Sequence, residues 1–176
     1  VSRGLGDVYK RQTFTNNNVL IELQNGANNA MLRFENINFV NENGSVTGPL
    51  FNISKGNMYF VNCSEQFATT AQHINIKGGG NAHIEGSQFR IVNVNANAKL
   101  YLSGDNQITA NICAASGSQY PQIIVEAAEA KAVTTPIELT FDNAESIAGL
   151  DKPFIYCTID INTVSYTHLR AHETLA

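Results

Sequence analysis

The chain has 176 residues, a formal net charge of −4 and no tryptophan. Beyond its first 12 residues the lysines and arginines are scattered singly, so there is no basic patch to neutralise the phosphates of a nucleic acid. No apolar run approaches the roughly 20 residues that span a bilayer. We therefore expect neither a nucleic-acid partner nor a membrane span in this chain.

Asparagine is unusually frequent, with 22 copies, while charged residues make up only 15% of the chain. Asn, Gly, Ser and Thr favour turns, and a chain rich in them and poor in charge is typical of an extracellular β architecture. The composition therefore predicts a secreted or surface-displayed β protein with many turns.

Both ends resemble translated sequencing-adapter DNA. Residues 2–12, SRGLGDVYKRQ, and residues 164–174, VSYTHLRAHET, fit translations of opposite strands of one adapter. Such additions are set aside in fold reasoning. We therefore assign residues 1–12 and 164–176 to the adapter, and expect the native ends, with any signal peptide or anchor, to lie beyond them.

With these ends set aside, residues 13–163 carry a net charge of −6. The spacing of His168 and His172 suggests a metal-binding pair on a helix, but both histidines fall in the adapter-like end. His73 and His83 alone do not make a zinc site. We expect no metal and no cofactor.

Residues 13–112 contain a repeated pattern of short strands, which we interpret as coils. Each copy reads apolar, any, apolar, any, then Asn or Gly, a short polar turn and another apolar residue. The copies are residues 32–39, 58–67, 82–89 and 100–108. The alternation predicts strands with one buried face. The turn residues Asn36, Asn62, Gly86 and Gly104 tolerate a left-handed backbone.

A second short strand precedes three of these copies, at residues 51–53, 74–76 and 92–94. The run Gly78-Gly79-Gly80 lacks the Lys and the helix start of a phosphate-binding loop, so we predict a bend there. Connections between coils vary in length, and residues 41–48 are the best candidate for a functional loop.

The pattern loosens in residues 113–163. We predict strands at 122–125, 137–141 and 153–159 and a helical or looped link at 126–131. We interpret this region as irregular further coils or a β cap of the same domain.

The repeat distinguishes two folds. Its apolar anchors Phe34, Phe60, Ile84 and Leu102 are separated by 26, 24 and 18 residues. In a sandwich of antiparallel hairpins nothing requires the same pattern to return every third strand, whereas stacked coils do require it. We therefore predict an all-β fold, a right-handed single-stranded parallel β-helix.

The segment from Phe34 to Phe39 reads F-E-N-I-N-F. It resembles the loose F-x-N-x-x-F repeats of pectate-lyase-like β-helices, particularly the non-catalytic branch of polymorphic outer-membrane and adhesin-like proteins. The resemblance covers about residues 30–110. It implies a bacterial secreted or cell-surface protein with a structural or adhesive role.

Stacking of the coils predicts columns of equivalent side chains. The expected columns are Phe34, Phe60, Ile84 and Leu102 inward; Phe39, Phe67, Phe89 and Ile108 inward; and Asn52, Asn75 and Asn93 outward. Each inward set stabilises its coil only when the neighbouring coils cover it.

The candidate ligand-binding site is the outward face of the better-aligned strand. It has Arg33, Tyr59, His83 and Tyr101 in one column, with Glu35 and Glu85 beside them. Tyrosine offers a flat apolar ring with a polar tip, and charged groups hydrogen-bond sugar hydroxyls. We expect an extracellular polysaccharide or a host or cell-surface glycan as partner, against the alternative of ordinary solvent-facing strand residues.

The enzymatic alternative is a polysaccharide lyase or glycoside hydrolase of the pectate-lyase-like fold. Such enzymes group their aspartates, whereas Asp105, Asp142, Asp151 and Asp160 are separate in this sequence. Stacking places the Glu35–Glu85 pair two coils apart, about 9–10 Å, at the limit for an inverting carboxylate pair. We predict no catalytic residues.

Oxygen ligands for calcium are available at Asp105 and Asn106, but a single acid does not define a site. The cysteines Cys63, Cys113 and Cys157 show no CxxC spacing. We predict three small buried or half-buried thiols, with one disulfide and one spare thiol as the alternative.

Overall fold

The computed structural model describes residues 11–13, 21–23, 30–41, 48–67, 73–113, 119–126, 133–142 and 153–157. In these residues the secondary structure is all β, and no helix is present that could cross a membrane. The strands are β1 (Arg11–Thr13), β2 (Ile21–Leu23), β3 (Met31–Glu35), β4 (Asn38–Asn41), β5 (Phe51–Ile53), β6 (Gly56–Val61), β7 (Ser64–Phe67), β8 (Ile74–Ile76), β9 (Gly80–Glu85), β10 (Gln88–Val94), β11 (Lys99–Ser103), β12 (Gln107–Ile112), β13 (Gln122–Val125), β14 (Glu138–Phe141) and β15 (Ile155–Cys157).

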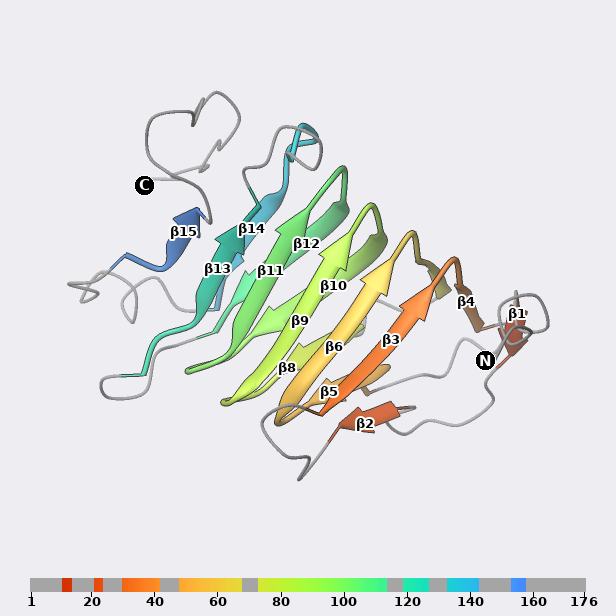
Figure 1. The fold of residues 1–176 in the computed structure, drawn as a ribbon, viewed down its shortest axis with the longest axis horizontal. Coiled ribbons are helices and arrows are strands. Elements are labelled where there is room, and N and C mark those ends of the chain that lie inside the picture. Colours follow the sequence, from red (N-terminus) through yellow and green to blue (C-terminus); the bar gives the residue numbers. More distant parts are fainter. Residues whose placement is uncertain are drawn as a thin grey trace.

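The described strands form two parallel sheets, which lie one behind the other in Figure 1. Sheet B has the order β15-β13-β11-β9-β6-β3. Sheet A has the order β1-β4-β7-β10-β8-β5-β2, with β12 pairing with β10 and β14. The strands next to one another come from successive coils and pair in parallel, which excludes the hairpin sandwich and confirms the predicted β-helix solenoid.

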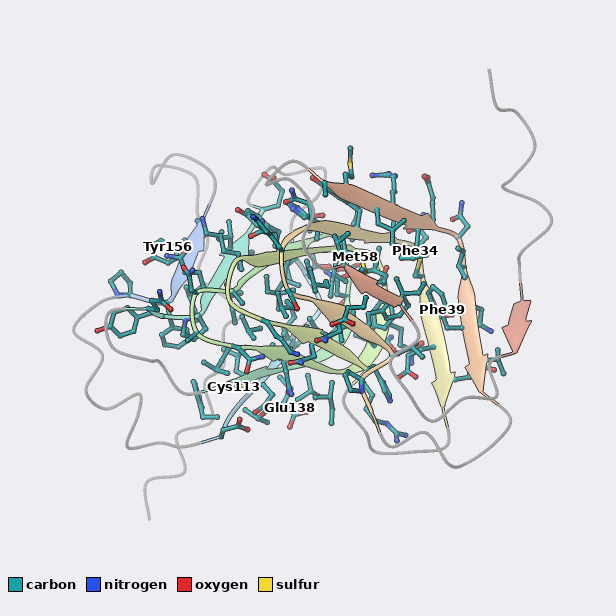
Figure 2. The ribbon with its side chains drawn as sticks, turned by 90° about the horizontal axis from the view of Figure 1, so that it is seen from below. Phe34, Phe39, Met58, Cys113, Glu138 and Tyr156 are labelled. Atoms are coloured by element: carbon teal, nitrogen blue, oxygen red, sulfur yellow. The ribbon has the colours of Figure 1, made fainter. Side chains whose placement is uncertain are left out.

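The core lies between the two sheets, and the predicted inward column of sheet B is confirmed. Backbone pairing aligns Phe34 with Phe60, Phe60 with Ile84, and Ile84 with Leu102. From sheet A, Phe51 and Phe89 pack edge-on against Phe60, with ring centroids 4.8 and 5.0 Å away. Figure 2 shows side chains in the space between the sheets, the labelled Phe34 and Met58 among them.

The predicted inward column of sheet A is wrong at one position. Phe39 pairs with Glu65, while Phe67 pairs with Asn41. Since Ser64 pairs with Gln88, the column passes from Phe39 through Glu65 to Phe89. Each of these residues lies three positions after its left-handed turn residue, so a constant turn length fixes the register and overrides the hydrophobicity of Phe67.

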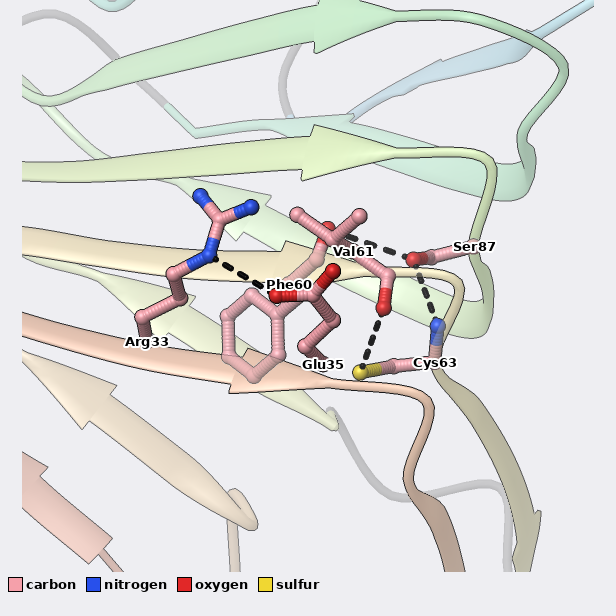
Figure 3. Close-up of polar contacts among 6 residues, drawn as sticks. All are labelled: Arg33, Glu35, Phe60, Val61, Cys63 and Ser87. Carbon is pink, nitrogen blue, oxygen red and sulfur yellow. Dashed lines mark hydrogen bonds and ion pairs between the residues drawn. The ribbon is translucent and has the colours of Figure 1, made fainter. Parts of the chain in front are cut away.

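The turns between the sheets are built as predicted. Asn36, Asn62, Gly86 and Gly104 have φ angles of 56°, 51°, 55° and 65°. The turn at Gly86 is also hydrogen-bonded to the turn at Asn62, because the Ser87 hydroxyl accepts a hydrogen bond from the Cys63 N–H at 2.9 Å (Figure 3). Hydrogen bonds of this kind hold successive turns in line along the stack.

The bend predicted at Gly78-Gly79-Gly80 is present between β8 and β9. Gly79 has a φ of 86°. A Cβ atom at Gly80 would come within 2.2 Å of the Ile53 carbonyl oxygen. Glycine is therefore required there by close approach of the neighbouring coil.

The predicted asparagine column is confirmed on the outer side of sheet A. Asn52 pairs with Asn75, and Asn75 with Asn93. The side chains form a series of hydrogen-bonded pairs: Asn75 Nδ2 donates to Asn52 Oδ1 at 3.0 Å, and Asn111 Nδ2 donates to Asn93 Oδ1 at 3.0 Å. Asn75 Oδ1 accepts from Asn95 Nδ2 at 2.8 Å. Asn52 and Asn93 are buried, so the series satisfies amide groups that would otherwise be costly to bury.

Three strands follow residue 112, at positions close to the predicted ones. β13 pairs with β11, β14 with β12, and β15 with β13, all in parallel. Residues 42–47 of the candidate loop at 41–48 and residues 127–131 of the link at 126–131 lie outside the described residues. The adapter-like residues 1–10 and 164–176 lie outside them as well, whereas Arg11–Thr13 forms β1 and pairs with β4.

Candidate functional site

The structure brings the predicted site residues together on the outer face of sheet B. Arg33 pairs with Tyr59, Tyr59 with His83, and His83 with Tyr101. The column continues to Ile124, which pairs with Tyr101. Because alternate residues of a strand point to opposite faces, these side chains form one outward row, which we call the ring column.

The rings of this column stack on one another. The centroids of Tyr59 and His83 are 4.1 Å apart with an interplanar angle of 14°, and those of His83 and Tyr101 are 4.2 Å apart with an angle of 6°. Stacking covers both faces of His83 and one face of each tyrosine. A ligand therefore meets ring edges and hydroxyl groups along the column, because the other faces of the two tyrosines are turned toward Arg33 and Ile124 on the neighbouring strands.

His83 is neutral over the physiological range. Burial between the two tyrosines lowers the pKa of the imidazole to about 4. The Nε2 atom lies 3.3 Å from Asn57 Oδ1, which also accepts a hydrogen bond from Asn81 Nδ2 at 3.1 Å. Since Asn57 Oδ1 acts as acceptor, Nε2 carries the proton and Nδ1 remains an acceptor.

A shallow depression of about 270 Å³ lies over the ring column. Of the candidate site residues, its lining includes Arg33, His83, both tyrosines of the column and Glu85 but not Glu35, and it also includes Ile124 and Glu126. The last two were missed because they follow residue 112, where the repeat loosens. The apolar run at residues 122–125 was the signal that would have extended the column to them.

The acidic side of the site begins with an ion pair. Arg33 Nε donates to Glu35 Oε2 at 3.3 Å (Figure 3), and both side chains are about half exposed. In the column of side chains beside the ring column, Val61 lies between Glu35 and Glu85. The two carboxylates are thus two strand spacings apart and are separated by an apolar side chain.

The described aspartates are used in structural contacts. Asp105 Oδ1 accepts hydrogen bonds from the Thr134 hydroxyl and from the Thr134 and Thr135 N–H groups, and the hydroxyl of Thr134 contributes most to lowering the pKa of this exposed carboxyl. Asp142 Oδ1 accepts from Asn111 Nδ2 at 2.7 Å. Asp151 and Asp160 lie outside the described residues.

Asn106 does not join Asp105 in a calcium-binding arrangement. It is fully buried, its Oδ1 accepts from the Ser87 N–H at 2.9 Å, and its Nδ2 donates to the Ser103 carbonyl at 3.0 Å. Within the described part of the chain, no three His, Cys, Asp or Glu side chains are grouped as metal ligands.

A buried ionisable pair lies far from the ring column, at the corner between β7 and β8. His73 Nδ1 and Glu65 Oε1 are 2.5 Å apart, and their side chains are only 4% and 6% exposed. The Arg90 N–H also donates to Glu65 Oε1 at 3.0 Å. Sequence reasoning missed this pair because it assigned the inward position to Phe67.

All three cysteines are free thiols. Cys63 is buried and Cys113 half-buried, as predicted, whereas Cys157 is exposed. Burial, followed by the neighbouring Asp142, raises the pKa of Cys113 to about 12. Cys113 is therefore a poor nucleophile at neutral pH.

Comparison with known proteins gives no match: no protein-family model fits the chain, and no curated protein or solved structure is significantly similar to it.

Proposed function

We propose that the chain belongs to a secreted or cell-surface bacterial β-helix protein of the pectate-lyase-like class, with a structural and adhesive role, and that it binds an extended glycan along the ring column. The observation that carries this proposal is the depression of about 270 Å³ over the outward row from Arg33 to Ile124. It combines tyrosine rings with carboxylates and a guanidinium, the groups that recognise sugar rings and hydroxyls.

The spacing of the column supports a polymeric ligand. Successive coils repeat at about 4.8 Å, which is close to the length of one sugar in an extended chain. Tyr59, His83 and Tyr101 occupy successive strands. One sugar can therefore lie over each coil and meet an equivalent set of ring edges, which a compact ligand would not use.

Catalysis is the second candidate, and one observation favours it. Glu35 and Glu85 stand two strand spacings apart, about 9–10 Å, at the upper limit of the separation found between the carboxylates of inverting hydrolases. However, Arg33 engages Glu35 and Val61 lies between the two acids. This ion pair engages a carboxylate that a catalytic pair would have to keep available for the substrate.

The test is a glycan-array screen followed by calorimetric titration of the best ligand. Removing one end of the ring stack, in Tyr59→Ala or Tyr101→Ala, is expected to weaken binding roughly five- to thirtyfold. Phe141→Ala is the matched control, because Phe141 is an exposed aromatic residue on sheet A. Release of unsaturated or reducing sugar ends would instead support the enzymatic alternative, and equal binding by all variants would place the ligand elsewhere.

A further inference from the structure

The two sides of the ring column differ in charge. The column on one side is Glu35, Val61, Glu85, Ser103 and, after β13, Glu126. The column on the other side is Met31, Asn57, Asn81, Lys99 and Gln122. Among the described residues, carboxylates therefore line only one side of the rings, and the opposite side offers amides and one lysine.

Two carboxylates line the depression. Its lining contains Glu85 and Glu126, while the charge of Arg33 is matched by Glu35. His83 adds no positive charge near neutral pH, because burial holds its pKa at about 4. Lys99 stands across the ring column from the carboxylates. A ligand lying over the rings therefore meets an anionic edge on one side.

The acids recur at every second coil. Glu35, Glu85 and Glu126 alternate with Val61 and Ser103, so neighbouring carboxylates are two strand spacings apart, about 9–10 Å. In an extended β-1,4-linked glycan each sugar is turned over relative to the last, so the same edge recurs at every second sugar. The repeat of such a glycan therefore spans two coils, as does the repeat of carboxylates along the acidic column.

Building on the glycan-binding role proposed above, we propose that the ligand is an extended β-1,4-linked glycan with free amino groups. Its sugars lie over successive coils, and the ammonium groups of alternate sugars face Glu85 and Glu126. Charge-assisted hydrogen bonds to these carboxylates favour an amino sugar over its N-acetylated form. A polyuronate is disfavoured, since its carboxylates would face carboxylates of the protein.

The experiment compares three hexasaccharides by calorimetric titration at about pH 6. The ligands are the β-1,4 hexamers of glucosamine and N-acetylglucosamine, and the galacturonate hexamer. The glucosamine hexamer is expected to bind about tenfold more tightly than the N-acetylated one, and the preference should decrease with added salt. In Glu85→Gln/Glu126→Gln the two affinities should agree to within about twofold.

The matched control is Glu138→Gln, which removes the same charge from an exposed position on sheet A and should keep the preference. Equal binding of the two glucosamine-type hexamers by the parent protein would overturn the amino-sugar inference and leave the glycan-binding role standing. Tightest binding of the galacturonate hexamer would overturn the inference as well. Absence of binding to these hexamers and to every glycan on the array would overturn both proposals.

Discussion

At the scale of single residues, the turns follow directly from backbone chemistry. Asn36, Asn62, Gly86 and Gly104 all adopt the left-handed conformation, which few other residue types tolerate. Their recurrence at the ends of β3, β6, β9 and β11 was visible in the sequence. The stacking of His83 between two tyrosines was not, because ring orientation depends on the side-chain rotamers and the strand spacing together.

The neutral state of His83 makes stability depend on pH. Its pKa in the folded protein is about 4, below the ordinary value of 6.5, so between these values the unfolded chain binds more protons. The contribution of His83 to the free energy of unfolding is therefore fully present above about pH 6.5 and falls as the pH is lowered toward 4. With allowance for solvent screening, we expect a loss of about 1 kcal/mol between pH 7 and pH 5.

The measurement is urea denaturation at the two pH values, with His83→Phe as the comparison. Phenylalanine keeps an aromatic ring between Tyr59 and Tyr101 and has no site for a proton. This variant should lose about 1 kcal/mol less than the parent on acidification. Asp105, whose pKa is lowered from 3.8, affects stability only at more acidic pH. An identical pH response in the two proteins would contradict a depressed pKa at His83.

At the scale of strands and turns, the register of strand pairing decided which residue of β7 occupies the inward column, and hydrophobicity did not. The sequence offers Phe67 as the apolar residue after Asn62, but β7 pairs with β4 so that Glu65 follows Phe39. A shift that made Phe67 the inward partner of Phe39 would lengthen the turn and move every other side chain of β7. The structure instead buries Glu65 against His73.

This pair is expected to behave as a coupled unit. Glu65→Leu leaves His73 in the buried corner without its carboxylate, and should cost about 3 kcal/mol of unfolding free energy. The double variant Glu65→Leu/His73→Leu replaces both polar side chains by apolar ones and should recover most of that loss. The measurement is a double-mutant cycle by urea denaturation, completed with His73→Leu alone.

The control for an apolar substitution on the same strand is Gln66→Leu, at an exposed position of β7, which should change stability by less than about 0.5 kcal/mol. Additive losses in the Glu65 and His73 variants would show that the two side chains do not stabilise each other.

At the scale of the whole molecule, each coil depends on its neighbours for burial. Phe51, Phe60 and Phe89 are fully buried in one cluster that joins the two sheets. A short parallel strand buries too little surface to be stable alone, so the coils are expected to fold cooperatively with those next to them. A disruptive substitution at one inward position should therefore destabilise the neighbouring coils as well.

Phe89→Asp tests this dependence. It removes a fully buried ring and places a charge in the core without a partner, so the cooperative thermal transition should be lost or shifted strongly to lower temperature. The measurement is circular dichroism during heating. Met31→Asp introduces the same charge at a side chain that is 67% exposed and should melt like the parent. Unchanged melting of Phe89→Asp would contradict the inward position of Phe89.

The sequence by itself determined the local pattern: alternating strands, left-handed turns and an approximate period, because each depends on neighbouring residues in the chain. From these the parallel stack, the column from Phe34 to Leu102 and the outward row of Arg33, Tyr59, His83 and Tyr101 could be predicted. Only the tertiary structure decided which residues share a column where the repeat is imperfect. It placed Glu65 inside with His73 and added Glu126 to the site, because pairing between coils is set by backbone hydrogen bonds across the whole stack.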